Sequence, residues 1–583
     1  MNVKIRMNEW FYNIGIVGMI RILKHAQFKG EKINFTIKED YLEIDSAIIE
    51  KFHEFYFEYF FDTYCENEYK IMTNYFDSIK KTVLTEHNFE ILDKKFEDKC
   101  AKVSGKNKKK GLEEDSIKID SALKRIKNNF DEVTFVELIK LIENLINKNE
   151  IKEKFALDSV RSMMYDNFFG QMSFMQKGFS NKGLSEHKKA AENDFIKPLL
   201  YDLKIKELVD KKDYESLKKY IKNTDSKGKG IGKYKNYLKK LKGNIVEFTK
   251  LCKNDSCPVC DTLPIEESFC ESNFMVLGVS NDNALNFFWN LNSKYPICNL
   301  CKLVLLCAPA GVVKFYKPYL DKNKNYYTFV NLDSDLEDLF LKNETLKNKM
   351  KSDCPYKEFI SDVLEQAKNE SIWTLQSIFF VEFNADYGSK KSNLIYMHIN
   401  KTVAKFFQKY SEQTIGKIKE KEFKNELIDK ILSSKELDSI IFKKLISISS
   451  DGKNTLDVIY AVYSKIILKY LKKGGGEAHM EDIKIIKNRI FKIYSTGREM
   501  AEYLKNNRSE NKISSIAYRL LNSAKVGDKK EFMDIILRLY INNELEMPEI
   551  FMEVFHEDKI DFETIAQSFI SGLVADKKGG QYE

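Results

Sequence analysis

The 583-residue sequence has few prolines and only a small excess of charge. It contains 8 prolines, and its 95 basic and 87 acidic residues give a formal net charge of +8. A chain so poor in proline is typical of a helix-rich protein and not of a sandwich or a collagen-like fold. The small net charge excludes a histone-like polycation, although it allows a local basic patch. Hydrophobic residues make up 43% of the chain, and its length predicts roughly four domains with more than one core.

The sequence also lacks a membrane-spanning run and a signal peptide. Trp10–Leu23 is apolar, but Asn13 and Arg21 interrupt it. It is too short to span a membrane, and no small-residue cleavage site follows. We expect a buried first helix in a soluble, cytoplasmic protein with no membrane partner.

Motifs of common catalytic sites are absent. No histidine precedes an aspartate, no H-E-x-x-H or G-x-S-x-G motif occurs, and Gly228–Lys233 lacks the Walker spacing. Three residues separate Arg21 from His25, which is too few for the arginine–histidine pair of small helical ribonucleases. The seven histidines are His25, His53, His87, His187, His398, His479 and His556. We therefore expect no enzyme, while a nuclease with a dispersed acidic site remains the alternative.

The cysteines are clustered and do not resemble a secreted disulfide framework. Seven of the ten lie between residues 252 and 307, and such clustering in a long chain points to a metal in a reducing compartment. The ten are Cys65, Cys100, Cys252, Cys257, Cys260, Cys270, Cys298, Cys301, Cys307 and Cys354.

Two C-x-x-C pairs, Cys257–Cys260 and Cys298–Cys301, form the sharpest motif. Two intervening residues let one tight turn aim both thiolates at one ion, at about 2.3 Å. Four thiolates leave no open position, so these cysteines predict a structural Zn²⁺ site. The alternatives are free buried thiols or a redox pair. We expect Cys252, Cys270 and Cys307 to be spectators, with Cys252 close enough to replace a ligand.

Two lysine-rich tracts and one amide-rich segment are candidates for nucleic-acid contact. Lysines on glycine-rich loops can reach phosphates without reading sequence, and Tyr234 and Tyr237 could stack on exposed bases. The tract lysines are Lys106, Lys108, Lys109, Lys110, Lys227, Lys229, Lys233, Lys235, Lys239, Lys240 and Lys242. A plain solvated surface is the alternative.

Asp158–Leu184 fits no clean period, and we predict an irregular, loop-rich segment. Its amides can read base edges and its glycines permit close approach to a groove, which makes Gln171, Lys177, Asn181 and Lys182 candidate reading residues. An ordinary polar loop anchored by Met and Phe is the alternative.

Periodicity predicts an α+β fold: a mixed N-terminal and central region with an inserted zinc-ribbon-like element, and an all-helical C-terminal bundle. We predict a hairpin at Lys32–Ile44, an aromatic core stripe in Ser46–Tyr64 and a mobile loop at Ser104–Gly111. Predicted strands are Ser272–Asn281, Lys302–Cys307, Asn325–Leu332 and Ile378–Asn384, with helices from Met397 onward. The predicted domains are 1–245 (mixed, with basic loops), 246–310 (zinc-binding), 311–396 (rest of the central region), 397–473 (helical) and 474–583 (C-terminal helical bundle, small-subunit-like).

Three segments together resemble one family, the large subunit of type I-B CRISPR interference (Cascade) complexes in the Tneap-subtype branch. Asn8–Leu23 (NEWFYNIGIVGMIRIL) resembles the N-terminus of that family, and the paired C-x-x-C motifs resemble its central zinc element. Ile516–Tyr540 and Phe562–Leu573 resemble its helical C-terminus.

The resemblance implies a non-catalytic subunit of an antiviral complex. Its partners would be guide RNA, target DNA, the backbone and other subunits, and a separate helicase-nuclease. It would help to recognise the motif beside the target, open the duplex and hold the displaced strand. The competing interpretations are a zinc-ribbon nuclease that processes nucleic acid and an interaction scaffold that binds none.

The segment Gly474-Gly475-Gly476-Glu477 precedes Met480. Written with GGA codons it reads GGAGGAGGAGAA, which resembles a ribosome-binding site. Some members of the family are thought to make their small subunit by internal initiation, so we predict a second product, Met480–Glu583, of 104 residues. Residues 472–540 hold 15 basic and 9 acidic residues, whereas 541–583 hold 3 and 10; the positive part could line the displaced strand. A flexible glycine linker is the alternative, and Met500 is an alternative start.

Overall fold

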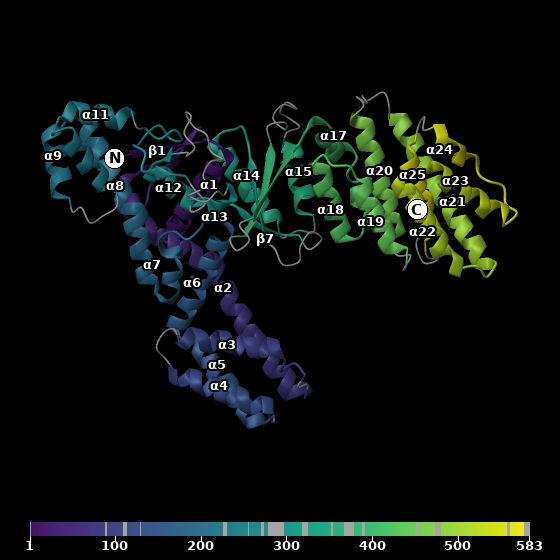
Figure 1. Cartoon of the computed structure of the whole chain (residues 1–583), viewed down its shortest axis with the longest axis horizontal. Helices are drawn as coiled ribbons and strands as arrows, with labels where there is room; N and C mark the ends of the chain where they lie inside the picture. The colour runs from purple at the N-terminus through teal and green to yellow at the C-terminus, as the bar shows by residue number, and fades with distance from the viewer. Residues whose placement is uncertain are drawn as a thin grey trace. The chain divides into compact units, whose positions relative to one another are not determined.

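The structure is a computed structural model of the chain (Figure 1). It describes residues 2–87, 90–108, 113–128, 130–224, 230–254, 256–269, 273–277, 296–317, 325–350, 352, 354–366, 378–386, 391–449, 454–472, 480–556 and 560–575.

Helices dominate the described residues, and the strands form small sheets. The strands are β1 (Asn2–Arg6), β2 (Phe35–Ile37), β3 (Tyr41–Asp45), β4 (Glu267–Ser268), β5 (Pro296–Ile297), β6 (Val313–Tyr316), β7 (Asn325–Asn331), β8 (Phe379–Asp386) and β9 (Lys391–His398). The α+β prediction is confirmed.

The helices are α1 (Trp10–Phe28), α2 (Ser46–Glu86), α3 (Lys94–Lys108), α4 (Glu113–Asn128), α5 (Glu132–Asn147), α6 (Asn149–Asn167), α7 (Leu184–Ala191), α8 (Lys197–Asp210), α9 (Tyr214–Asn223), α10 (Ile231–Lys240), α11 (Ile245–Asn254), α12 (Asn299–Leu306), α13 (Ala308–Gly311), α14 (Leu336–Lys349), α15 (Pro355–Gln366), α17 (Lys401–Lys409), α18 (Lys421–Leu432), α19 (Asp438–Ile448), α20 (Thr455–Lys472), α21 (Met480–Asn506), α22 (Asn511–Val526), α23 (Lys529–Ile541), α24 (Glu553–His556) and α25 (Phe562–Leu573). Short 3₁₀ turns are η1 (Ser173–Met175), η2 (Lys177–Asn181), η4 (Met275–Leu277), η7 (Ile415–Lys417) and η9 (Glu549–Met552), and η3 (Glu192–Ile196) is a π-helical turn.

The chain divides into two compact units. The first contains Met1–Val312, Ser334–Phe340 and Phe383–Leu394; the second contains Val313–Asp333, Leu341–Glu382 and Ile395–Glu583.

The first unit begins with a three-stranded antiparallel sheet in the order β1-β3-β2. The predicted hairpin at Lys32–Ile44 is confirmed as β2 and β3, and β1 pairs with the free edge of β3. Val3 pairs with Ile44 and Ile5 with Leu42, and all four side chains are buried. The alternation of buried and exposed residues explains why the sequence showed the strands, because a period of two fits a sheet with one covered face.

Two apolar segments near the N-terminus form the core of the first unit. α1 is buried along nearly its whole length, as expected. The aromatic stripe of α2 is also confirmed as core: Phe52, Phe55, Tyr56, Tyr59 and Phe60 are each at most 6% exposed.

Two helical subdomains in the first unit have cores of their own. One is formed by the second half of α2, by α3, α4 and α5, and by the start of α6, around residues such as Phe96 and Phe135. The other is formed by α8–α11 around Leu217, Tyr234 and Phe248.

Three local predictions are wrong. Lys302–Cys307 lies in α12 and at its end, and is not a strand; this run is buried on every side, so it shows neither a period of two nor of 3.6. Asp158–Asn167 completes α6, so the irregular segment begins at Phe168. Ser104–Lys108 belongs to α3, whereas residues 109–112 lie outside the described residues.

The second unit holds most of a sheet in the order β6-β7-β8-β9. β6 and β7 are antiparallel, with Val313 opposite Thr328. The strands predicted at Asn325–Leu332 and Ile378–Asn384 are confirmed as β7 and β8. A fourth local prediction, the strand at Ser272–Asn281 in the first unit, is also wrong over its described residues: Met275–Leu277 is a 3₁₀ turn, and Ser272 and 278–281 lie outside the described residues.

The chain after β9 is helical, as predicted, and ends in a bundle of α21–α25 (Figure 1). α21 and α25 cross at two glycines: a Cβ atom at Gly497 would collide with the Phe569 carbonyl, and one at Gly572 with the Tyr494 carbonyl. Among the described residues, no helix is both long enough and apolar enough to cross a membrane.

Candidate functional site

Four cysteine sulfurs converge in the first unit. The Sγ atoms of Cys257, Cys260, Cys298 and Cys301 all lie within 4.8 Å of one another. Cys257 Sγ lies 3.7 Å from Cys301 Sγ, and Cys260 Sγ lies 3.5 Å from Cys298 Sγ. Sulfurs at the corners of a tetrahedron with about 2.3 Å metal–sulfur bonds stand about 3.8 Å apart. The structure thus brings the four predicted ligands close enough together to share one metal ion.

The first C-x-x-C knuckle, Cys257–Cys260, is a tight turn held by backbone hydrogen bonds. The Asp261 N–H donates to the Cys257 carbonyl at 2.7 Å, and the Cys257 N–H donates to the Leu263 carbonyl at 2.9 Å. Asp261 has a φ of 46°, a left-handed conformation that aspartate tolerates better than most residues. The turn fixes the direction of Cys257 and Cys260 before any ion binds.

The second knuckle lies at the start of α12. Cys298 is the N-cap residue of this helix, and Cys301 lies in its first turn. β5 leads into it and pairs antiparallel with β4, so Ile297 lies opposite Glu267. A helix N-terminus favours negative charge, which suits two thiolates at this position.

The four-cysteine site is deeply buried and fits a metal cation. Cys257, Cys298 and Cys301 are fully buried, and burial raises the pKa of the Cys298 and Cys301 thiols. A thiolate without a counter-charge is costly here, and a divalent cation supplies that charge. These four cysteines could therefore bind a metal ion, which would tie the α10–α11 side of the chain to α12 without an open coordination position.

The start of the chain and helix α1 pack against one side of the four-cysteine site. The Tyr12 hydroxyl lies 3.6 Å from Cys301 Sγ, and Asn8 Nδ2 donates to the Val259 carbonyl inside the first knuckle at 2.7 Å. Burial, and after it the neighbouring sulfurs, raise the pKa of Tyr12. Its hydroxyl therefore stays protonated. It accepts from the Cys301 thiol in this structure and could donate a hydrogen bond to a Cys301 thiolate.

Backbone-to-backbone contact holds α1 against α12 and α13. A Cβ atom at Gly15 would collide with the Val304 carbonyl, one at Gly18 with the Cys307 carbonyl, and one at Gly311 with the Ile14 carbonyl. The buried Arg21 guanidinium donates to the carbonyls of Ala310 and Val312, at 2.8 and 3.0 Å. Residues near the start of the chain thus position the second knuckle.

A buried polar network lies behind the second knuckle. Asp202 of α8 is fully buried and accepts hydrogen bonds from the Tyr234 hydroxyl at 2.6 Å and from Asn299 Nδ2 at 2.8 Å. Lys233 Nζ lies 3.3 Å from Asp202 and 2.5 Å from Glu266. Sequence reasoning missed Tyr12, Asn299 and Asp202, because no local pattern shows which distant side chains meet.

The remaining cysteines of the cluster stand apart from the centre. Cys307 is fully buried, and its thiol lies 3.3 Å from the Leu303 carbonyl. Cys252 of α11 is half-buried and lines a cavity of about 250 Å³ together with Asp202, Tyr234 and Asp261. Cys270 lies outside the described residues.

The predicted lysine tracts lie in different surroundings. Lys233 is half-buried between two carboxylates, and Lys235 Nζ donates to the Thr224 carbonyl at 2.5 Å. Lys239, Lys240 and Lys242 are exposed at the end of α10. Tyr234 is buried in the core of α8–α11. The side chains of Lys106 and Lys108, and all of Lys109, Lys110, Lys227 and Lys229, lie outside what the structure describes.

The irregular segment 168–183 is anchored by cationic side chains from α6. Lys154, only 1% exposed, donates to the Ser180 carbonyl and pairs with Asp158. Arg161 donates to the Gln176 carbonyl at 2.9 Å. Phe174 and Met175 are buried beneath the segment. The backbone is thus fixed from within, by two residues for which the sequence offered no signal.

The predicted reading residues point outward from this anchored segment. Gln171, Lys177, Asn181 and Lys182 are all exposed. Gln171 Nε2 donates to the Tyr165 hydroxyl at 3.1 Å, and Lys182 Nζ lies 5.0 Å from the centre of the Phe179 ring. No acidic residue occurs from Asn167 to Ser185. This surface could donate hydrogen bonds to, and neutralise, an anionic partner.

Residues 250–313, which contain both knuckles and α12–α13, match the model of a family described as CRISPR-associated protein (Cas_CXXC_CXXC). This match indicates a CRISPR-associated protein. No curated protein matches the chain, and no solved structure matches it.

Proposed function

We propose that the chain is the large subunit of a guide-RNA-directed type I-B interference complex and has no catalytic activity of its own. The observation that carries the proposal is the four-cysteine element. It matches a CRISPR-associated family, and it is built against the N-terminal helix whose sequence resembles the large subunit. Type I-B identity and the large-subunit role are the finer steps that we add.

The metal is Zn²⁺ in this proposal, and its role is structural. Four clustered sulfur ligands, three of them buried, suit tetrahedral zinc and would leave no position for water or substrate. The ion would hold α12 in register with the first knuckle and so support the packing of α1.

The anchored segment 168–183 is the part that we assign to target DNA. Exposed amides and lysines on a fixed backbone suit recognition of a short motif in a groove, with Gln171 and Asn181 at base edges and Lys177 and Lys182 at phosphates. Lys239, Lys240 and Lys242 are the described lysines of the second tract that remain exposed for phosphate contact.

The purified complex tests this assignment. Replacing Lys177 with Ala should weaken DNA binding for all sequences and reduce the salt slope by about one. Gln171→Ala should instead change the preference among flanking motifs. Lys188→Ala is the matched control, because Lys188 already pairs with Glu54 at 2.9 Å. Equal loss in the control and in Lys177→Ala would remove the segment from the interface.

The C-terminal bundle is the candidate for a second, internally initiated product. α20 ends at Lys472 and α21 begins at Met480, so a start at Met480 keeps every helix of the bundle whole. A start at Met500 would divide α21, where Met500 is buried. We therefore favour Met480. Synonymous recoding of the three glycine codons should abolish the 104-residue product, and its persistence at full level would refute internal initiation.

Purification from native cells through a C-terminal tag tests the function itself, with RNA and protein analysed together. A uniform small RNA and partner subunits would support the interference complex, and an added fragment starting at Met480 would support the internal start. The chain alone, with metal but no RNA, would overturn the proposal. Metal-dependent cleavage by the pure chain would indicate the nuclease instead.

A further inference from the structure

Helix α25 carries a stripe of buried polar side chains. Apart from Glu563, every residue from Phe562 to Leu573 is buried. Thr564, Gln567, Ser568 and Ser571 recur along it at helical spacing, and Asp561 caps its start. Such a stripe is unusual in a core helix, because each buried polar group must be satisfied by a partner.

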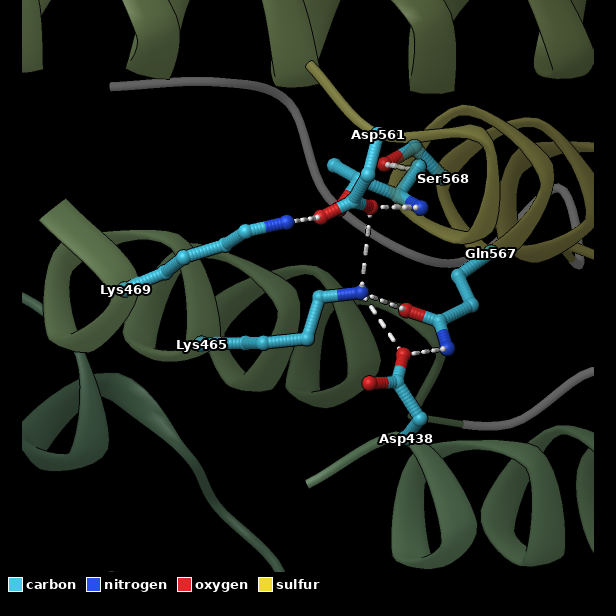
Figure 2. Close-up of polar contacts among 7 residues, drawn as sticks. Asp438, Lys465, Lys469, Asp561, Gln567 and Ser568 are labelled. Atoms are coloured by element: carbon cyan, nitrogen blue, oxygen red, sulfur yellow. Dashed lines mark hydrogen bonds and ion pairs between the residues drawn. The ribbon is translucent and has the colours of Figure 1, made fainter. Parts of the chain in front are cut away.

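The outward partners of this stripe belong to α19 and α20, as Figure 2 shows. Lys465 Nζ of α20 lies 3.1 Å from Gln567 Oε1, 3.5 Å from Asp561 and 2.7 Å from Asp438 of α19. Gln567 Nε2 donates to the same Asp438 carboxylate at 2.8 Å.

Further polar contacts extend this junction on both sides. Lys469 pairs with Asp561 at 2.9 Å. The Ser571 hydroxyl donates to the Thr455 carbonyl at 2.8 Å. We call these contacts between α25 and α19–α20 the polar junction.

Apolar contacts instead join α25 to its own bundle. Phe569 packs on Phe551, with ring centres 5.1 Å apart, and Phe562 packs on Phe532 of α23 at 5.2 Å. Gly572 lies directly against the backbone of α21. The bundle 480–575 therefore has apolar contacts of its own. It meets the helices before it through these charged and amide groups and through one ring contact, between Tyr460 of α20 and Phe491 of α21, whose centres lie 5.8 Å apart.

The polar junction is also open to water. A groove of about 1070 Å³ runs along it and is lined by residues of both sides, among them Asp438, Lys465, Lys469, Lys525 and Asp561. Interfaces that form and separate reversibly are more polar than permanent ones and are bordered by water.

We propose that α19–α20 is a docking surface from which the C-terminal bundle can separate, and that this surface accepts a second copy of residues 480–583. The chemistry of the contacts defines the partner. It must bring the Asp561 carboxylate and the Gln567 amide to the Lys465 ammonium, and the Ser571 hydroxyl to the Thr455 carbonyl. The inference stands on these contacts and does not depend on the proposed function.

The test uses the full chain. A protease site is inserted between Lys472 and Met480, the folded protein is cleaved, and it is mixed with a cleaved, fluorescently labelled copy. We expect the labelled bundle to exchange into unlabelled protein, faster at high salt because screening weakens the partly exposed ion pairs. Circular dichroism of the released bundle should keep its helical signal.

Variants identify the surface. Lys465→Gln should speed exchange at least tenfold, since it removes the cation that Asp438 and Asp561 share and leaves Asp561 only its pair with Lys469. Lys469→Gln, at a lysine that is 53% exposed, should act in the same direction but less and serves if the first variant does not fold. Arg538→Gln is the matched control, because Arg538 makes an exposed pair with Asp534 within α23 and does not line the groove. No exchange in any variant, or release only as an unfolded chain, would overturn the proposal.

Discussion

Two helix junctions of this protein join distant parts of the sequence by opposite means. At the glycine junction, α1 meets α12–α13 through Gly15, Gly18 and Gly311, with backbone against backbone. At the polar junction, α20 meets α25 through Lys465, Lys469 and Asp561. The first has no room for a Cβ atom, whereas the second borders a groove of about 1070 Å³. Close backbone packing favours a permanent junction, whereas hydrogen-bonded charges favour a separable one. When the two sides separate, water can solvate the exposed charged groups well, but it cannot replace the lost close packing.

The largest effect should come from filling the glycine junction. Gly18→Ala places a methyl group against the Cys307 carbonyl, which cannot move away as a flexible side chain would, so we expect a loss of at least about 2–3 kcal/mol of stability. Thermal denaturation of the purified chain measures it. Gly232→Ala is the matched control, since a Cβ atom there meets nothing within 4 Å. Comparable losses at the two positions would show that the close contact does not matter.

Removal of a metal ligand should weaken the same unit and leave the polar junction intact. If the four cysteines bind a metal ion, as we propose, Cys298→Ser should abolish the bound metal and expose the first unit to protease, because the ion would tie the two knuckles together. Cys307→Ala should retain the metal, although it leaves a small cavity in the buried core. Elemental analysis and limited proteolysis provide the readout. Full metal content in the Cys298 variant would remove it from the ligand set.

Acid should separate the polar junction. Burial acts to raise the pKa of Asp561, but the Lys465 charge and the hydrogen bonds from Thr564 and Lys469 outweigh it and lower that pKa well below its usual range. A carboxyl group whose pKa is lower in the folded state stabilises the fold at pH values above its unfolded-state pKa, which is about 4. This stabilisation is lost as the pH falls toward the folded-state pKa.

Bundle exchange in the cleaved protein should therefore accelerate as pH falls below about 4. Asp561→Asn keeps an N-cap residue for α25 but removes the titrating group. This variant should exchange faster at neutral pH and respond less to acid. The same pH response in the variant and in the native protein would assign the effect to another group.

Sequence reasoning succeeded where the pattern is local and failed where the partner is distant. The hairpin alternation, the aromatic stripe of α2 and the two C-x-x-C knuckles each lie within a short window, and all were visible. α12 was mistaken for a strand because a helix buried on every side has no amphipathic period. The sequence does not show the roles of Gly18 and Lys154. Gly18 makes room for the Cys307 carbonyl far along the chain, and Lys154 binds the Ser180 carbonyl of a loop that folds back on α6.

The smallest predicted effect tests how α1 contributes to the metal centre beyond packing. Tyr12→Phe removes the hydroxyl 3.6 Å from Cys301 Sγ and leaves the ring in place. A hydrogen bond to a metal-bound thiolate stabilises its negative charge, so its loss should make the ion leave several-fold faster in a chelator competition, at a cost of about 1 kcal/mol. Tyr56→Phe is the control: this buried hydroxyl donates to the Leu306 carbonyl and not to a cysteine ligand. Equal release rates in both variants would mean that α1 supports the four cysteines only through its packing. The glycine junction alone would then explain why residues near the start of the chain lie against a metal-binding element almost 300 residues away.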